Sequence, residues 1–215
     1  MDAEQALRMI DAFVSVGATN FDLSLTRCVN GRDGRPYDEK VPGKQLTNAH
    51  FRELHFRIRK ILEESERERW SVIIRPCKES PSAMIVQLDD LSAERLESIK
   101  PYAFLVVRSS PGNYQAWVAV AEVNAGEMAR RLQRGVGADT NASGAGRIAG
   151  SRNWKPHHGP VFPHVEIVYW QSGYRAKWND LESAGLVAPA SAAKPAPAPR
   201  TGHRGAAPHN EENLV

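Results

Sequence analysis

The stretch Met84-Ile85-Val86-Gln87-Leu88-Asp89-Asp90-Leu91 ends an apolar run on two adjacent acids. The run is short and contains β-branched residues, so it predicts a buried strand that delivers Asp89 and Asp90 at its C-terminal edge. Neighbouring carboxylates repel each other, and Mg²⁺ or Mn²⁺ would offset that repulsion because these ions prefer hard oxygen ligands. The alternative is that Asp90 and Ser92 only cap the next helix.

Segments on both sides of this strand alternate between helical and strand patterns. Apolar residues at helical spacing predict helices over 4–16, 47–69, 92–99 and 124–135. Alternating or continuous apolar runs predict strands over 20–26, 71–75, 102–108, 114–120 and 165–170. Residues 31–43 are rich in Gly, Pro and Asp and predict a loop. The expected fold class is α+β, with a mostly antiparallel sheet flanked by helices.

Length and composition are those of one soluble globular domain, because the chain has 215 residues of which 41% are apolar and 25% charged. No apolar run reaches the ~18 residues of a transmembrane helix, and the N-terminus lacks the apolar core of a signal peptide. Cys28 and Cys77 show no metal-binding spacing; the simpler interpretation is a pair of reduced thiols in a cytoplasmic protein, and the alternative is a disulfide between them. Ala and Pro dominate from Ala188, which predicts a folded domain over 1–187 and a disordered tail over 188–215.

Positive charge gathers in the C-terminal half of the domain. Between Ala125 and Asp180 the sequence has eight Lys or Arg residues against four Asp or Glu residues. An excess of this sign suits a phosphate-bearing ligand, and the alternative is an ordinary solvated basic face. Arg147, Arg152, Asn153 and Lys155 lie among small residues in a Gly-rich segment that could cradle phosphates, although its order is not that of a P-loop.

Three further features concern side chains that could reach a ligand. Ser109 to Trp117 predicts a hairpin that presents Asn113, Gln115 and Trp117 on one strand face, where an amide beside an aromatic ring could hold a sugar or a base. Asp139 follows in a Gly-rich loop as a turn residue or as a third carboxylate. His157, His158 and His164 lack zinc-site spacing and are interpreted as polar loop residues or phosphate contacts.

The order of these motifs over residues 72–171 resembles the RepB-like primase domain of plasmid replication proteins, a compact branch of the archaeo-eukaryotic primase superfamily. The resemblance rests on Ile74-Arg75-Pro76, Leu88-Asp89-Asp90-Leu91-Ser92, Ser110-Pro111-Gly112-Asn113-Tyr114-Gln115-Ala116-Trp117, Ala138-Asp139 and Gly146-Arg147-Ile148-Ala149-Gly150, with Asn153 and Lys155. It implies an RRM-like core, and catalytic, metal-binding roles for Asp89, Asp90 and Asp139 with two Mg²⁺ or Mn²⁺ ions. The superfamily's S-x-H histidine has no counterpart here, and Asn113 and Gln115 stand nearby.

The resemblance also implies a function, namely a DNA primase that makes short primers on single-stranded DNA during replication of a plasmid or mobile element. NTP or dNTP would contact Asn113, Gln115, Arg147, Asn153 and Lys155, and DNA would contact Arg130, Arg131, Arg152, Tyr114 and Trp117. Replication proteins such as a helicase or an initiator are the expected partners, with no membrane involved. Two alternatives stay open: a catalytically silent nucleic-acid-binding module and a metal-dependent nuclease.

Overall fold

The computed structural model describes residues 1–31, 36–77, 83–121 and 126–190. The predicted tail beyond residue 190 and the predicted helix cap at Asn124 lie outside these ranges. The helices are α1 (Ala3–Ser15), α2 (Phe51–Glu68), α3 (Ala93–Ile99), α4 (Gly126–Val136) and α5 (Trp178–Ser183), with short 3₁₀ turns at Lys100–Tyr102 and Pro156–His158. None of the helices in these ranges is both long and apolar enough to cross a membrane.

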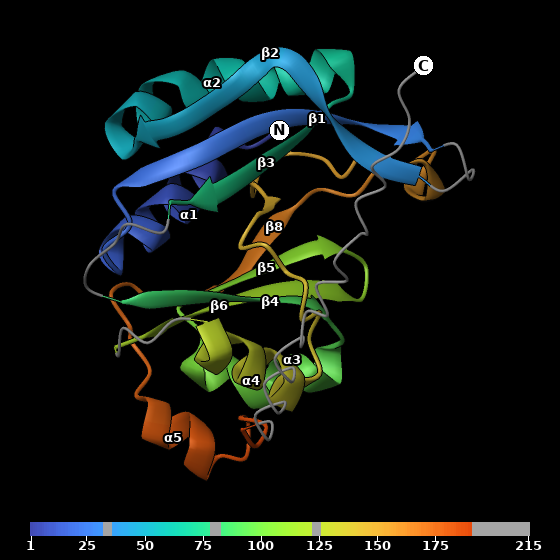
Figure 1. Ribbon diagram of the computed structural model, residues 1–215. Coiled ribbons are helices and arrows are strands. Elements are labelled where there is room, and N and C mark those ends of the chain that lie inside the picture. Colours follow the sequence, from blue (N-terminus) through green and yellow to red (C-terminus); the bar gives the residue numbers. More distant parts are fainter. Residues whose placement is uncertain (32–35, 78–82, 122–125, 191–215) are drawn as a thin grey trace, which may run out of the picture.

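The strands form two antiparallel sheets of four strands each, so the α+β expectation is confirmed, with two sheets in place of one. The first sheet has the order β2 (Pro36–His50), β1 (Asn20–Asn30), β3 (Ser71–Pro76), β7 (Gly146–Arg147). The second has the order β4 (Met84–Leu91), β6 (Asn113–Val120), β5 (Leu105–Ser110), β8 (Glu166–Trp170). Figure 1 shows α2 beside the first sheet, and α3 and α4 on the far side of the second sheet.

Two apolar cores hold these layers together. The larger core joins α1, α2 and both sheets, and at its centre the Phe13 ring meets Phe21, Phe104 and Trp117 edge-to-face at centroid distances of 6.1, 5.6 and 5.6 Å. The smaller core packs the opposite face of the second sheet against α3, α4 and α5. The second sheet is therefore packed against apolar residues on both faces.

The predicted loop over residues 31–43 is wrong from Pro36 onward, because Pro36–His50 forms strand β2 against β1, and residues 32–35 lie outside the described ranges. β2 lies at the edge of its sheet, where a proline costs no ladder hydrogen bond. The pairing shifts between Ser24–Gln45 and Thr26–Lys40, so the Val-Pro-Gly-Lys segment between them bulges out with Gly43 at a φ of 69°. The Gly and Pro content of this segment correctly indicated an interruption of the β1–β2 hydrogen bonds, but it did not reveal the strand on either side of the interruption. Helix α2 begins at Phe51 instead of Thr47, and α5 had no prediction.

Residues 138–158 connect the two sheets and bring the motifs together. β7 pairs with β3 of the first sheet, whereas the Gln87 side chain of the second sheet donates from Nε2 to the Ala145 carbonyl at 2.8 Å. The seam between the sheets therefore passes beside the end of β4 and the β5–β6 hairpin. The predicted hairpin is confirmed, and its turn has Pro111 followed by Gly112 at a φ of 74°, as a type II turn requires.

Candidate active site

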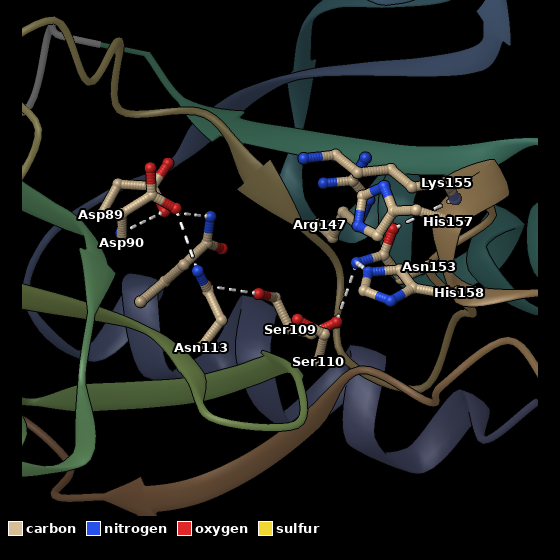
Figure 2. A pocket seen from close by; sticks show the side chains of 11 residues that line it. Asp89, Asp90, Ser109, Ser110, Asn113, Arg147, Asn153, Lys155, His157 and His158 are labelled. Atoms are coloured by element: carbon tan, nitrogen blue, oxygen red, sulfur yellow. Dashed lines mark hydrogen bonds between the residues drawn. The ribbon is translucent and has the colours of Figure 1, made fainter. Parts of the chain in front are cut away.

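A β-bulge at the end of β4 carries the two adjacent aspartates. Leu88 pairs with Ala116 and Leu91 pairs with Tyr114, so Asp89 and Asp90 together face the single residue Gln115. Asp90 adopts a left-handed backbone with a φ of 57°. Consecutive residues of a regular strand point to opposite faces, and a bulge re-aims one of them. Both side chains consequently line the same cleft, as Figure 2 shows.

Two amide side chains of β6 hold these carboxylates. Gln115 donates from Nε2 to Oδ1 of Asp89 at 2.8 Å, and Asn113 donates from Nδ2 to Oδ1 of Asp90 at 3.0 Å. The Asp90 backbone N–H also donates to Oδ1 of Asp89 at 2.9 Å. Burial nevertheless raises the pKa of Asp89, and the charges of Asp90 and Asp139 raise it further. The hydrogen bonds do not fully offset the negative charge gathered at this point.

The third predicted carboxylate lies beside this pair. The backbone N–H of Asp139 donates to the Asp89 carbonyl at 3.2 Å, and its Oδ1 accepts from the Asn141 N–H at 2.9 Å. Arg95 anchors the same loop by donating to the Gly137 carbonyl at 2.5 Å. In the part of the chain that is described, no three His, Cys, Asp or Glu side chains converge closely enough to hold one metal ion. The chemistry of Asp89, Asp90 and Asp139, carboxylate oxygens with excess negative charge, suits Mg²⁺ or Mn²⁺, although the three side chains do not converge on one point.

Four cationic or imidazole side chains face the aspartates across the cleft. We call this group the basic wall; it consists of Arg147, Lys155, His157 and His158. The floor of the cleft consists of Ser109, Ser110, Asn113, Gln115 and Asn153. The cavity measures about 120 Å³, below the ~300–1,000 Å³ of sites that enclose a whole small molecule. It therefore suits the charged end of a ligand.

Arg147 is the most buried member of the basic wall, with 8% of its surface exposed. Its Nη2 donates to Asp38 Oδ2 at 2.8 Å, and its buried Nε has no hydrogen-bond partner among the described residues. The preceding residue must be glycine, because a Cβ on Gly146 would meet the Trp117 ring at 2.7 Å and Gln115 Oε1 at 2.8 Å. Gln115 Oε1 is likewise buried without a partner. Two unsatisfied polar atoms of opposite character therefore lie in the walls of this cleft.

Asn153 connects the basic wall to the carboxylate side. Its Nδ2 lies 3.0 Å from the Ser109 carbonyl and 3.3 Å from Nε2 of His158. The carbonyl can only accept, so the amide NH₂ must face it, and His158 Nε2 must then accept as well. His158 is therefore the neutral tautomer with its proton on Nδ1. Its pKa is lowered by burial and by the charges of His157, Lys155 and Arg147.

Ser109 completes a continuous hydrogen-bonded chain across the cleft. Its hydroxyl donates to Asn113 Oδ1 at 2.9 Å while its carbonyl accepts from Asn153. The chain runs from Asp90 through Asn113, Ser109 and Asn153 to His158, and Figure 2 shows these contacts. Sequence reasoning gave no role to Ser109 or Asp38, because their contacts join segments far apart in the chain. It named His157 and His158 only as loop residues or phosphate contacts.

The predicted DNA-binding residues do not form one surface. Trp117 is 1% exposed in the larger core, so its predicted stacking on a base is wrong; its strand face points between the sheets. Arg131 pairs with Glu182 at 3.0 Å, and Arg152 pairs with Glu66 at 2.9 Å. Tyr114 is half-buried against the smaller core. Arg130 is exposed on α4 and lines a different groove.

Comparisons with known proteins bear on the fold of the chain. No protein-family model matches the sequence. The fold is similar to the crystal structure of primase RepB′ (TM-score 0.59, 26% identity, 84% of this chain and 62% of that chain). It is also similar to the catalytic domain of primase RepB′ in complex with initiator DNA (TM-score 0.58, 25% identity, 84% of this chain and 94% of that chain). The primase-polymerase domain of cyanophage S-2L shares the fold alone (TM-score 0.51, 11% identity, 85% of this chain and 97% of that chain).

A curated relative points in the same direction. Mobilization protein A of Escherichia coli is 36% identical over 97 residues, which make up 40% of this chain and 14% of that protein. The chain thus spans less than two thirds of the first RepB′ structure and about a seventh of the mobilization protein. The resemblance read from the motifs and the predicted fold class are both confirmed.

Proposed function

We propose that this chain, which carries a RepB-like primase domain, is a nucleotidyltransferase that makes short primers on single-stranded DNA for a plasmid or mobile element. The observation that carries the proposal is the opposition of charge across one cleft: Asp89 and Asp90 on one side and the basic wall on the other. Nucleotidyl transfer requires this pairing of an acidic, metal-attracting edge with a cationic phosphate site.

The basic wall would bind the triphosphate of the incoming nucleotide. Arg147 has an unpartnered Nε to donate to a phosphate oxygen, and Lys155 contributes a point charge. The neutral His158 has one proton to donate, on Nδ1. Because the cavity measures only about 120 Å³, it suits phosphate groups, and the sugar and base would lie outside it.

The carboxylate edge would hold the metal ions. Asp89, Asp90 and Asp139 would ligate Mg²⁺ or Mn²⁺, and such ions supply charge neutralisation for the phosphates and activation of the attacking hydroxyl. Gln115 and Asn113 orient the two bulge carboxylates and leave their remaining oxygen lone pairs for this role. Asn153, with both amide protons committed, acts by holding the wall in position instead of contacting the nucleotide.

The two alternatives make different use of this cleft. A nuclease also needs clustered carboxylates, but it acts on phosphodiesters and has no need of a cationic wall shaped for a terminal phosphate chain. A catalytically silent DNA-binding module would gain nothing from a buried carboxylate at Asp89, because burial disfavours the ionised form of that side chain. The basic wall therefore favours nucleotide transfer over a nuclease, and the buried pair of carboxylates favours an enzyme over a silent module.

Primer synthesis tests the proposal directly. Purified protein is incubated with a single-stranded DNA template, labelled NTP or dNTP, and Mg²⁺ or Mn²⁺, and the products are resolved by length. Wild type and the exposed control Glu97→Gln should give template-dependent products, and Asp89→Asn should give none. Degradation of the template without products would identify a nuclease, and template binding without either activity would identify a silent module.

A further inference from the structure

A second hollow lies along β4 and is separate from the cleft. We call it the β4–α4 groove; its volume is about 510 Å³, and it lies between the edge strand β4, helix α4 and the loop Thr140–Gly144 (β4 and α4 are labelled in Figure 1). It shares no lining residue with the cleft. The proposed function leaves it without a role.

The β4–α4 groove leads to the same aspartates as the cleft. Strand β4 lines it from Met84 to Gln87, two residues before Asp89, and Asp139 directly precedes the loop that forms its other side. Gln87 fixes that loop, because its Oε1 accepts from the Gly144 N–H at 2.9 Å. Gln133 of α4 in turn donates to the Gln87 carbonyl at 3.1 Å. The three sides of the groove are therefore tied to one buried glutamine and hold a defined shape.

The chemistry of the groove is cationic, apolar and hydrogen-bonding at once. Arg75 and Arg130 line it, and no Asp or Glu does so among the described residues. Arg75 is paired with Asp22 at 2.5 Å, so Arg130 supplies the unpaired positive charge. The half-buried apolar residues Ile85 and Ala129 lie beside the polar groups of Thr140, Asn141 and Ser143. A nucleotide uses all three kinds of contact: its phosphate binds a cation, the face of its base packs on apolar groups, and the edge of its base forms hydrogen bonds. A groove of 510 Å³ has the size of one small ligand, and so suits one unstacked nucleotide.

Arg130 differs from its neighbours on the same helix. Arg131 pairs with Glu182 at 3.0 Å and Arg134 pairs with Glu127 at 2.8 Å, whereas within the described ranges no acid pairs with Arg130. An exposed guanidinium with no internal partner at the mouth of a groove is available for a phosphate. The other arginines of α4 are already neutralised.

We infer that the β4–α4 groove binds the single-stranded template, with one nucleotide seated beside Asp139 and its phosphate on Arg130. The inference rests on the proposed function and adds a direction to it: template and triphosphate reach the carboxylates from two different hollows. The Asp139 loop, tied to the Asp89 carbonyl, is the boundary between them.

The test is the affinity for a fluorescein-labelled 12-nucleotide single-stranded DNA, measured by anisotropy without metal or nucleotide. Arg130→Ala should weaken binding about five- to tenfold and reduce the slope of log K against log salt by about 0.7, the value for one phosphate contact on a single strand. Arg134→Ala is the matched control, with the same charge change on the same helix outside the groove. It should change affinity less than twofold.

A second variant separates shape from charge. Ala129→Gln extends into the groove without altering charge and should also weaken DNA binding. Equal losses for Arg130→Ala and Arg134→Ala, together with unchanged binding by Ala129→Gln, would overturn the inference. A separate measurement distinguishes failure of the groove assignment from failure of the proposed function. It compares the affinity of wild type and of Arg147→Ala for a fluorescent NTP in Mn²⁺. If that affinity is intact while the groove variants fail to respond, the proposed function stands and the groove assignment is wrong.

Discussion

At the scale of single residues, Asp89 pays an electrostatic cost in the protein without metal. Burial raises its pKa, so the folded state holds the proton more strongly than the unfolded chain does, and ionisation opposes folding. The cost is fully present above the raised pKa, shrinks as the pH falls below it, and is gone below the ordinary pKa of an aspartate in the unfolded chain, where Asp89 is protonated in both states. The same residue should be stabilised by a bound cation.

Asp89→Asn should therefore raise the melting temperature at pH 7 in a chelator, because the amide keeps an acceptor for Gln115 without the charge. The difference from wild type should shrink as pH approaches 4. Mn²⁺ should raise the melting temperature of wild type and leave that of the variant unchanged. Thermal denaturation across pH measures all three effects. A variant less stable than wild type at pH 7 would show that the hydrogen bonds outweigh the burial of charge.

Asn153 offers a second prediction at this scale. Asn153→Asp places an acceptor against the Ser109 carbonyl and loses that hydrogen bond, which should destabilise the protein by about 1–3 kcal/mol. The new carboxylate should also favour protonated His158, so the pKa of His158 should rise from its lowered value. Urea denaturation and NMR titration of the histidine ring give the two readouts. An unchanged His158 titration would show that the side chain at position 153 does not contact the His158 ring.

At the scale of elements, the sequence predicted best where one segment determines its own structure. The apolar run of β4 and the Pro-Gly turn of the β5–β6 hairpin were both identified, since local pattern and turn chemistry suffice there. The bulge at Asp89 and Asp90 was not, because it exists only in the pairing with Gln115. β2 was missed because its Pro and Gly residues are tolerated only at a sheet edge. The contact of Asp38 with Arg147 depends on that missed strand.

Strand β7 depends on one glycine, and this gives a prediction for the element. Gly146→Ala would press a methyl group against Trp117 and Gln115, and should cost about 1–3 kcal/mol and displace Arg147. Gly126→Ala on α4 is the control, because its Cβ meets nothing within 4 Å. It should be neutral or slightly stabilising, since alanine favours helix. Urea denaturation and nucleotide affinity check both variants; equal behaviour would mean that the seam between the sheets adapts to a larger side chain.

At the scale of the whole molecule, the site exists because two sheets meet. The carboxylates come from the second sheet, Arg147 comes from β7 of the first, and the 138–158 segment crosses between them. The sequence showed the acidic, amide and basic motifs one by one, and the resemblance to the RepB-like domain predicted that they share one site. The partition into a phosphate cleft and a separate groove required the tertiary arrangement, because residues near in sequence, such as Arg130 and Arg131, face different surroundings.

The central claim is that the carboxylates and the basic wall act on the same triphosphate. A double-mutant cycle of Asp89→Asn and Arg147→Ala tests it, with nucleoside triphosphate affinity measured by calorimetry in Mn²⁺ for wild type, both single variants and the double variant. We predict that the losses are not additive, with a coupling of more than about 0.5 kcal/mol, because one ligand spans both groups. Losses that add within about 0.5 kcal/mol would show that the two sides bind independently and would contradict the account.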